Sequence, residues 1–434
     1  MKLTKNCLMA AGAALALAAS FPLSAQSEDD MFAGASPLVN DGTSAKADTV
    51  DGLLKTDAIK IGGSFALEAG ARGNPEDWKE GMNADSIAVP FTSSSVNLFA
   101  DARPAEDYRF YAKGKMNYTP ALTTFELREA FADIQPLEGL SVRAGKQTAN
   151  WGVGYFFSPG NLLDLQAINP EDPTAERTGP LAVRLQKSAK TDNYYAYFLL
   201  EDASNGGAVG IAPKAEWLLG SAEVSLGGLW ENDKPWAATT SVTFPLSSLD
   251  FFAEATVRGN EDKVFIIENS LSPIGVTTET RSARVFPFAT GGFSWSKTDD
   301  QNRGDISLRA QYYYNGEGYL DPSLLQDKSA SVGLLLAQKK ISIDDLRERG
   351  QHYGAAMLSV SNILNSDAGV TFFWLGSLSD GSGKTSVTAS WDRLTHVRMS
   401  LAYEYTYGEK GSEYAFNGPV PSVTLKVSLT QGTF

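Results

Sequence analysis

The residue types most often used in catalysis are scarce in this chain. Its 434 residues include two histidines and one cysteine. His352 and His396 lie in no recognisable nucleophile motif, and no His, Asp and Glu residues follow the spacing of metal ligands. The sequence therefore predicts neither an enzymatic activity nor a bound cofactor.

Charged side chains that alternate with apolar ones are more informative. In the stretch YRFYAKGKMNY (108–118), the basic residues all fall on one parity and Tyr108, Phe110 and Met116 on the other. Rows of charge along an aqueous passage set a transverse field that filters ions. We therefore expect a polar lumen lined by Arg109, Lys113, Lys115, Arg128, Arg184, Arg309, Arg398, Glu126, Glu254 and Glu404, the first four forming a charge-selective face.

Period-two alternation of this length is typical of β-strands with two unlike faces. It recurs along most of the chain, and we count eighteen such runs. They lie near 59–72, 93–103, 108–118, 123–135, 139–151, 180–190, 193–202, 209–219, 221–231, 236–245, 248–258, 286–297, 304–315, 352–361, 369–379, 384–393, 396–408 and 421–430.

The lengths of the connections between these runs predict the architecture. Links that follow odd-numbered runs include 73–92, 152–179, 259–285, 316–351 and 409–420, which are long and irregular, whereas links after even-numbered runs are short and turn-like. This sorting is typical of outer-membrane barrels, with long loops outside and short turns in the periplasm. We predict an all-β fold, a transmembrane antiparallel up-and-down β-barrel of about 18 strands, with 16 as the alternative.

The N-terminus predicts export. Residues 1–25 combine Lys2 and Lys5 with an apolar, alanine-rich stretch and the sequence PLSA, as in a signal peptide. Residues 26–56 are acidic and lack a pattern, so we expect a flexible periplasmic segment before a barrel at 57–434. The formal net charge of −14 argues against nucleic acid as a partner.

The C-terminus is consistent with a barrel. The stretch PSVTLKVSLTQGTF places Val423, Leu425, Val427 and Leu429 on one face and ends in Phe434. A terminal aromatic residue after such a strand resembles the signal read by the barrel-assembly machinery. Phe434 falls on the opposite parity, so the assignment requires a bulge near Gly432.

Two stretches conflict with simple alternation. In TFELREAFADIQP, Glu129 and Asp133 share a parity with Phe125 and Leu127. Because a carboxylate facing lipid is unfavourable, we expect a bulge or burial of Glu129. In VRAGKQT, Lys146 is in phase with the apolar residues Val142 and Ala144, so simple alternation does not fix the register of that strand.

Two long loops invite separate predictions. Residues 318–350 show helical periodicity, with Asp321 or Ser342 placed to cap a short helix. Such a loop can either narrow the passage or cover its outer mouth, and we expect it to narrow the passage. Residues 150–179 are rich in proline and aromatic residues, so we expect them to be ordered.

The stretches LREAFADIQP, GLSVRAGKQTANWGVG, FSPGNLLD, NPEDP and ERTGP, within 126–184, resemble porin-like outer-membrane barrels of the alginate-export and phosphate-selective types and related uncharacterised families. The resemblance implies that Lys146, Gln147 and Trp151 lie at or near the lumen. From the barrel architecture we expect a bacterial outer-membrane channel, surrounded by lipids, for passive diffusion of small hydrophilic solutes, with a homotrimer as one assembly. Two alternatives stay open, a non-conducting adhesin or scaffold barrel and a plugged transporter of hydrophobic substrates.

Overall fold

The computed structural model describes residues 59–73, 89–163, 165–166, 168–201, 209–232, 234–298, 304–363, 366–394 and 397–431. The predicted signal peptide, the segment 26–56 and Phe434 lie outside these ranges. No helix within them is long and apolar enough to cross a membrane.

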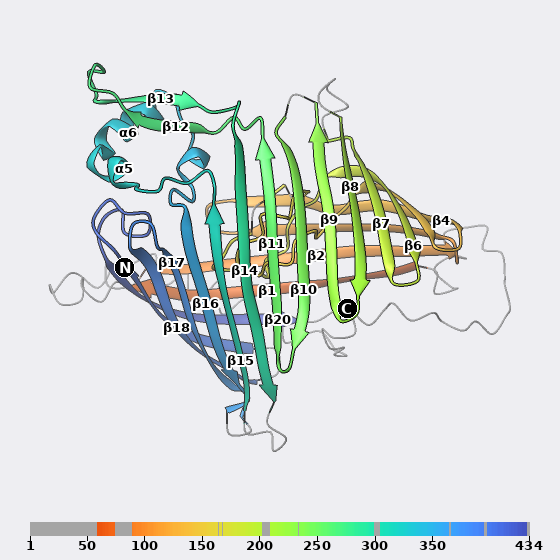
Figure 1. Cartoon of the computed structure of the whole chain (residues 1–434). Coiled ribbons are helices and arrows are strands. Elements are labelled where there is room, and N and C mark those ends of the chain that lie inside the picture. Colours follow the sequence, from red (N-terminus) through yellow and green to blue (C-terminus); the bar gives the residue numbers. More distant parts are fainter. Residues whose placement is uncertain are drawn as a thin grey trace.

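Eighteen strands of the described residues form one antiparallel sheet that closes on itself (Figure 1). Each strand pairs with its neighbour in the chain, and the last strand pairs with the first, with Ala69 opposite Val427. The predicted fold class and strand number are therefore confirmed. The strands are β1 (Ile59–Gly73), β2 (Val89–Ala105), β3 (Tyr108–Tyr118), β4 (Thr123–Leu137), β5 (Leu140–Lys146), β6 (Leu181–Ala189), β7 (Asp192–Leu199), β8 (Gly210–Leu219), β9 (Ala222–Glu231), β10 (Trp236–Leu246), β11 (Leu249–Gly259), β14 (Val285–Thr298), β15 (Asp305–Asn315), β16 (His352–Ser361), β17 (Ala368–Ser377), β18 (Ser382–Leu394), β19 (Val397–Tyr407) and β20 (Val420–Gln431).

The connections are sorted by length between the two ends of the barrel. At one end the strands are joined by short links such as 106–107, 138–139 and 220–221. The other end carries the long connections, such as 147–180 and 316–351, beside the short links 119–122, 232–235 and 378–381. We call these the short-turn end and the long-loop end. An up-and-down barrel places alternate connections at opposite ends, which is why the parity of loop lengths was visible in the sequence.

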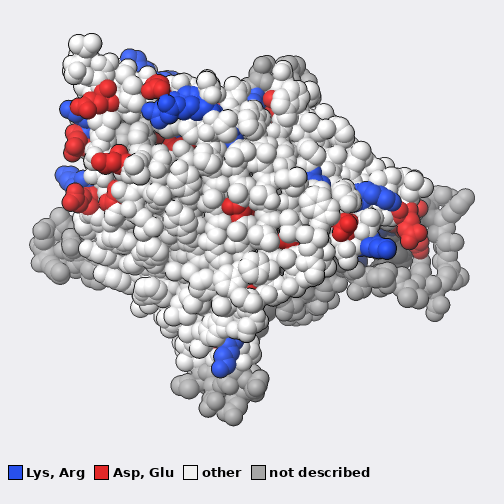
Figure 2. Space-filling model, in the orientation of Figure 1, with Lys and Arg blue, Asp and Glu red and all other residues white. Residues whose placement is uncertain are grey.

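The outer face of the barrel is apolar. Large side chains such as Phe110, Leu226, Trp230 and Leu401 are each more than half exposed, and they alternate along their strands with inward-facing residues. Figure 2 shows charged side chains gathered mainly toward the edges of the visible face, with a broad and mostly uncharged surface between them. An exposed apolar band of this extent is unfavourable in water and matches a lipid environment.

A bulge at Arg128 resolves the conflict in β4. Lys113 is opposite Glu129 whereas Gly114 is opposite Leu127, so Arg128 is the extra residue in the pairing. The bulge reverses the parity of the strand and turns Glu129 and Asp133 into the lumen. The prediction of a bulge is confirmed. Phe131 also faces inward as a result, and it is 7% exposed.

The long-loop end carries a small folded layer of its own. The hairpin of β12 (Val264–Glu268) and β13 (Val276–Thr280) lies beside α5 (Ser323–Asp327) and α6 (Ser329–Ala337) at the upper left of Figure 1. Their buried side chains Ile266, Val276, Leu325 and Leu335 form one apolar cluster with Ile341, which follows α6. The predicted helical character of 318–350 is confirmed, whereas the sequence analysis missed the hairpin.

Both residues predicted as helix caps in this layer accept backbone hydrogen bonds. Asp321 accepts the N–H of Ser323 at the start of α5, over 2.9 Å. Ser342 and Asp345 form reciprocal hydrogen bonds beside the 3₁₀-turn Asp344–Leu346, since each side chain accepts the N–H of the other residue. The placement of the helices differs from our expectation, because α5 and α6 pack on the hairpin at the long-loop end.

Gly145 in β5 offers a test of the barrel geometry. Its φ is +134°, and a Cβ added there would lie 2.1 Å from the carbonyl oxygen of Ala130 on the neighbouring strand. We expect Gly145→Ala to destabilise the barrel by at least about 2 kcal/mol, because both the conformation and the space exclude a side chain. The heat-modifiable shift on gels after refolding measures this loss. Gly228→Ala is the control, since its nearest neighbour would be 3.4 Å away, and equal folding of both variants would contradict the prediction.

Candidate functional site

The connection between β5 and β6, residues 147–180, folds back against the inner wall of the barrel; we call it the inner segment. Its first anchor is Gln147, which is fully buried and donates from Nε2 to the carbonyl oxygen of Ala182 over 3.0 Å. Trp151 follows, 3% exposed, with its ring edge-on to Tyr197 of β7. Lys214 of β8 donates to the Trp151 carbonyl oxygen over 3.0 Å.

The Glu254 carboxylate on β11 fixes the next turn of the inner segment. It accepts hydrogen bonds from the backbone N–H groups of Val153, Gly154 and Gly160 and from the hydroxyl of Ser158. Glu254 is only 3% exposed. Hydrogen bonds to an ionised acceptor are about twice as strong as neutral ones, so this carboxylate is a strong anchor for the segment.

Gln311 on β15 holds the adjoining residues. Its Oε1 accepts the N–H groups of Tyr155 and Phe156, at 3.1 and 2.7 Å, and its Nε2 donates to the Phe157 carbonyl oxygen. Phe156 and Phe157 are thereby placed in an apolar cluster on the inner wall. The cluster includes Tyr313, Tyr353, Phe373 and Leu375 from β15, β16 and β17.

The return limb of the inner segment contacts a different part of the wall. Glu171 forms an ion pair with Lys384 of β18 at 2.8 Å, and Glu176 forms one with Lys113 of β3. Arg128 of β4 donates to the Glu176 carbonyl oxygen over 3.0 Å. Because these contacts lie on β18 at one point and on β3 and β4 at the other, residues 171–176 connect separate parts of the barrel wall.

The sequence-predicted inward charges are mostly compensated by carboxylates. Arg109 forms two hydrogen bonds with Asp101, at 2.9 and 3.1 Å. Arg128 pairs with Glu126 at 2.9 Å. Of the four residues predicted as a charge-selective face, three therefore have acidic partners, and two of them hold the inner segment.

Other predicted charges have varied partners. Arg398 pairs with Asp392 at 2.7 Å near the short-turn end, and Glu404 lies 3.5 Å from Lys384. Arg309 stands over the ring of Tyr155, 4.3 Å from its centroid. Of the predicted cations, Lys115, Arg184 and Arg309 form no ion pair within 4.0 Å with another described residue.

The residues matched to the family motif occupy two different faces. Gln147 and Trp151 are buried inside the barrel. Lys146 is opposite Ala130 and Leu181, in the outward-facing row that alternates with Arg143 and Gly145. Lys146 therefore lies on the opposite face of the barrel wall from Gln147 and Trp151.

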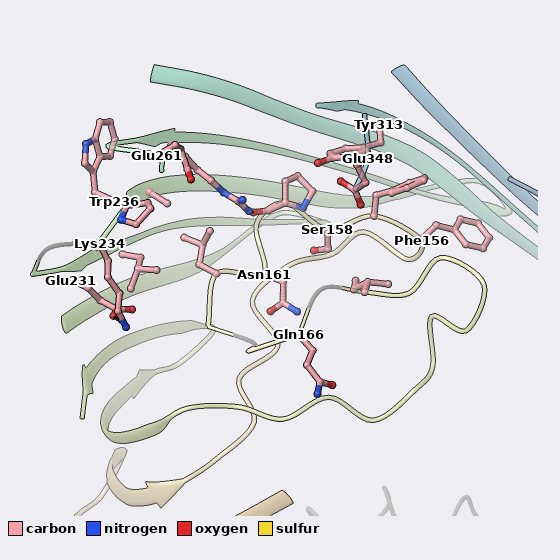
Figure 3. Close-up of a pocket in the computed structure, with 18 residues that line it drawn as sticks. Phe156, Ser158, Asn161, Gln166, Glu231, Lys234, Trp236, Glu261, Tyr313 and Glu348 are labelled. Carbon is pink, nitrogen blue, oxygen red and sulfur yellow. Dashed lines mark hydrogen bonds and ion pairs between the residues drawn. The ribbon is translucent and has the colours of Figure 1, made fainter. Parts of the chain in front are cut away.

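Cavities remain on both sides of the inner segment. At the short-turn end, a cavity of about 390 Å³ is lined by Arg109, Asp133, Arg143 and Arg184. Toward the long-loop end lie two cavities of about 410 and 940 Å³, which share Phe157, Arg258 and Tyr313 among their lining residues. Figure 3 shows the smaller one, with Ser158 and Asn161 of the inner segment on one side and Glu261 and Trp236 on another.

The two long-loop cavities are acidic. Burial raises the pKa of Glu261 to about 7, and the neighbouring charge of Glu317 adds to the shift. Burial also raises the pKa of Glu413 to about 7, although a hydrogen bond from Tyr353 acts in the opposite direction. Burial raises the pKa values of Glu317 and Glu348 as well.

The sequence analysis missed several residues of this site. Gln311, Lys214 and Arg258 have inward parity, but the analysis did not single them out. Arg258 donates to the Pro159 carbonyl oxygen over 3.2 Å and lies 4.7 Å from the ring of Phe288. A search for polar residues at inward positions of adjacent strands would have found all three, without revealing that they hold residues 151–160.

No protein-family model matches the chain, and no curated protein matches it either. Among solved structures, the chain is similar to several mutants of a porin from Rhodopseudomonas blastica. One is 12% identical with a TM-score of 0.43, over 86% of this chain and 99% of that chain. A triple mutant of the same porin is 11% identical, with the same TM-score and coverage. The strand pairing itself establishes the closed antiparallel barrel of 18 strands among the described residues.

Replacing the anchor of the inner segment tests its role. We expect Glu254→Gln to loosen residues 150–160, because an amide offers one acceptor oxygen in place of two and carries no charge. The loss should be about 2–4 kcal/mol for the local opening of this segment. Hydrogen exchange of residues 151–160 in the refolded barrel measures it. Glu223→Gln, an exposed carboxylate on β9, is the control, and unchanged exchange in Glu254→Gln would refute the anchor.

The raised pKa of Glu413 predicts a pH dependence. A carboxyl group whose folded pKa is raised stabilises the fold at pH values below its usual pKa of about 4.5, and this stabilisation is lost as the pH rises to about 7. We expect the local stability of 411–415 to fall by an amount on the order of 2 kcal/mol between pH 5 and pH 8. Glu413→Gln should abolish this slope, as followed by hydrogen exchange. Glu409→Gln, at an exposed position in the same connection, should retain it.

Proposed function

We propose that this chain is a bacterial outer-membrane channel that lets small hydrophilic solutes and ions diffuse passively, with the inner segment as its constriction. The observation that carries the proposal is the fixed position of residues 151–160 on the inner wall, held by Glu254 and Gln311. A charged inner surface, narrowed by an ordered segment and with cavities on either side, suits a selective passage for polar solutes.

The outer surface supports the membrane part of this proposal. A closed barrel leaves no unpaired strand edge, and its lipid-facing side chains are apolar. The proposal includes removal of a signal peptide at 1–25, a periplasmic segment at 26–56, and assembly into the outer membrane by the barrel-assembly machinery through the C-terminal strand and Phe434. Assembly into a homotrimer is included as a further part of the proposal.

The charges that the structure leaves without partners refine the expected selectivity. In this proposal Lys115, Arg184 and Arg309 line the passage without a carboxylate partner, whereas Arg109, Lys113 and Arg128 are paired with carboxylates. A paired cation contributes a much weaker field at a distance than an isolated one. In this proposal, ion selectivity is therefore set by Lys115, Arg184 and Arg309. It is not set by all four of the cations predicted from the sequence, Arg109, Lys113, Lys115 and Arg128.

One observation favours a second function, adhesion. The layer at the long-loop end exposes large apolar side chains, with Leu271 93%, Leu320 72% and Ile343 70% exposed. A partner protein at the cell surface could cover them. An adhesin would need no continuous passage, and this difference separates the two proposals in a conductance measurement.

Conductance of the refolded mature chain in planar bilayers, under a salt gradient, tests the channel. We expect discrete current steps, and we expect Lys115→Glu to shift the reversal potential toward cation preference because it reverses an unpaired charge in the passage. The control is Arg398→Glu. Arg398 lies at the short-turn end and is paired with Asp392, so this variant should shift the reversal potential less. If barrels that are demonstrably folded and heat-modifiable carry no current, the channel proposal is refuted and adhesion is favoured.

A further inference from the structure

The inner segment divides the barrel wall into a covered part and a free part. Its hydrogen bonds, ion pairs and ring contacts reach β3, β4, β6, β7, β8, β11 and β15 to β18. In the part of the chain that the structure describes, none of these contacts involves β19, β20, β1 or β2. These four strands are consecutive in the closed sheet, so they form one continuous strip, which we call the free wall.

The burial of inward-facing side chains follows this division. Where the inner segment contacts the wall, Tyr197, Gln311 and Tyr353 are each at most 5% exposed. On the free wall, the side chains of Glu68 and Lys426 are each 37% exposed, and they form an ion pair at 3.1 Å. Both face inward, because they alternate with apolar residues of the outer face. At the level of the inner segment, the free wall therefore keeps an accessible inner surface.

Small polar side chains line much of the free wall. Its inward positions include Ser64, Ser93, Ser95, Asn97, Ser400, Ser422 and Thr424. Such side chains extend only a short way from the wall, and so they leave more space beside it than tyrosine or phenylalanine would. Their hydroxyl and amide groups also hydrogen-bond to water and to polar solutes. This composition suits an aqueous passage.

The return limb of the inner segment bounds the space beside the free wall. Its ion pairs, Glu171 with Lys384 on β18 and Glu176 with Lys113 on β3, lie on the two strands that flank the free wall. The side chains of Glu171 and Glu176 are 43% and 44% exposed, so they are not packed into the wall. Residues 171–176 therefore span the interior between the two edges of the free wall.

We infer that the solute path of the proposed channel runs along the free wall, between residues 171–176 and the inner face of β19, β20, β1 and β2. Solutes on this path pass the ion pair of Glu68 and Lys426. The opposite side carries no solute at this level, because residues 151–160 fill it. The inference rests on the proposed channel function and adds to it the route that solutes take.

Modification of single cysteines tests the route. Cys7 is the only cysteine of the chain and lies in the predicted signal peptide, so a refolded chain that begins at residue 26 has none. Ser95→Cys places a thiol on the free wall. Ser225→Cys is the matched control, because Ser225 faces inward on β9 and is 4% exposed. We expect reaction with the cationic reagent trimethylammonium-ethyl methanethiosulfonate to lower the current of Ser95→Cys by about half or more, and to leave that of Ser225→Cys unchanged.

Mass spectrometry shows which thiol has reacted, and the heat-modifiable gel shift shows that each variant is folded. A conducting Ser95→Cys barrel that keeps its full current after complete reaction would overturn the inferred route and leave the channel function intact. An equal loss of current in Ser225→Cys would also overturn it, since both sides of the interior would then be open. If the unmodified folded chain carries no current, the channel function itself is refuted and the route with it.

Discussion

The position of residues 153–160 inside the barrel depends first on the carboxylate of Glu254 and the donors that surround it. A charged group pointing into a narrow space must be hydrated or receive hydrogen bonds, because burying it without either is strongly unfavourable. Here the donors come mainly from the backbone of residues 153–160. The same contact therefore satisfies the charge and fixes the segment, which in turn places Phe157 between the cavities at the long-loop end.

The architecture could be predicted from the sequence because alternation is a local property. Residues such as Tyr108 and Phe110 reveal the face of a strand through their immediate neighbours, and turn residues mark the strand ends within a few positions. The number of strands and the sorting of loop lengths follow from these local signals. The bulge at Arg128 could also be anticipated, because simple alternation would have placed Glu129 against lipid.

The interior could not be predicted in the same way, because its interactions join residues far apart in the chain. Lys113 and Glu176 are 63 positions apart, and Gln311 and Phe156 are 155 positions apart. Inward parity identified Lys113 as facing the lumen but gave no information on its partner. For this reason the sequence indicated a role in ion selectivity for Arg109, Lys113, Lys115 and Arg128. In the fold, two of these four residues, Lys113 and Arg128, hold the inner segment at Glu176.

The pairing of β1 with β20 has a consequence for folding. The ion pair of Glu68 and Lys426 closes a loop of 358 residues, among the least local contacts that a chain of this length can make. The entropy of closing such a loop opposes the contact until nearly all other strands are in register. Closure is therefore a late step, and until then the two terminal strands expose open edges that can pair with other chains. Until closure, a chain with this topology is prone to aggregate through these edges.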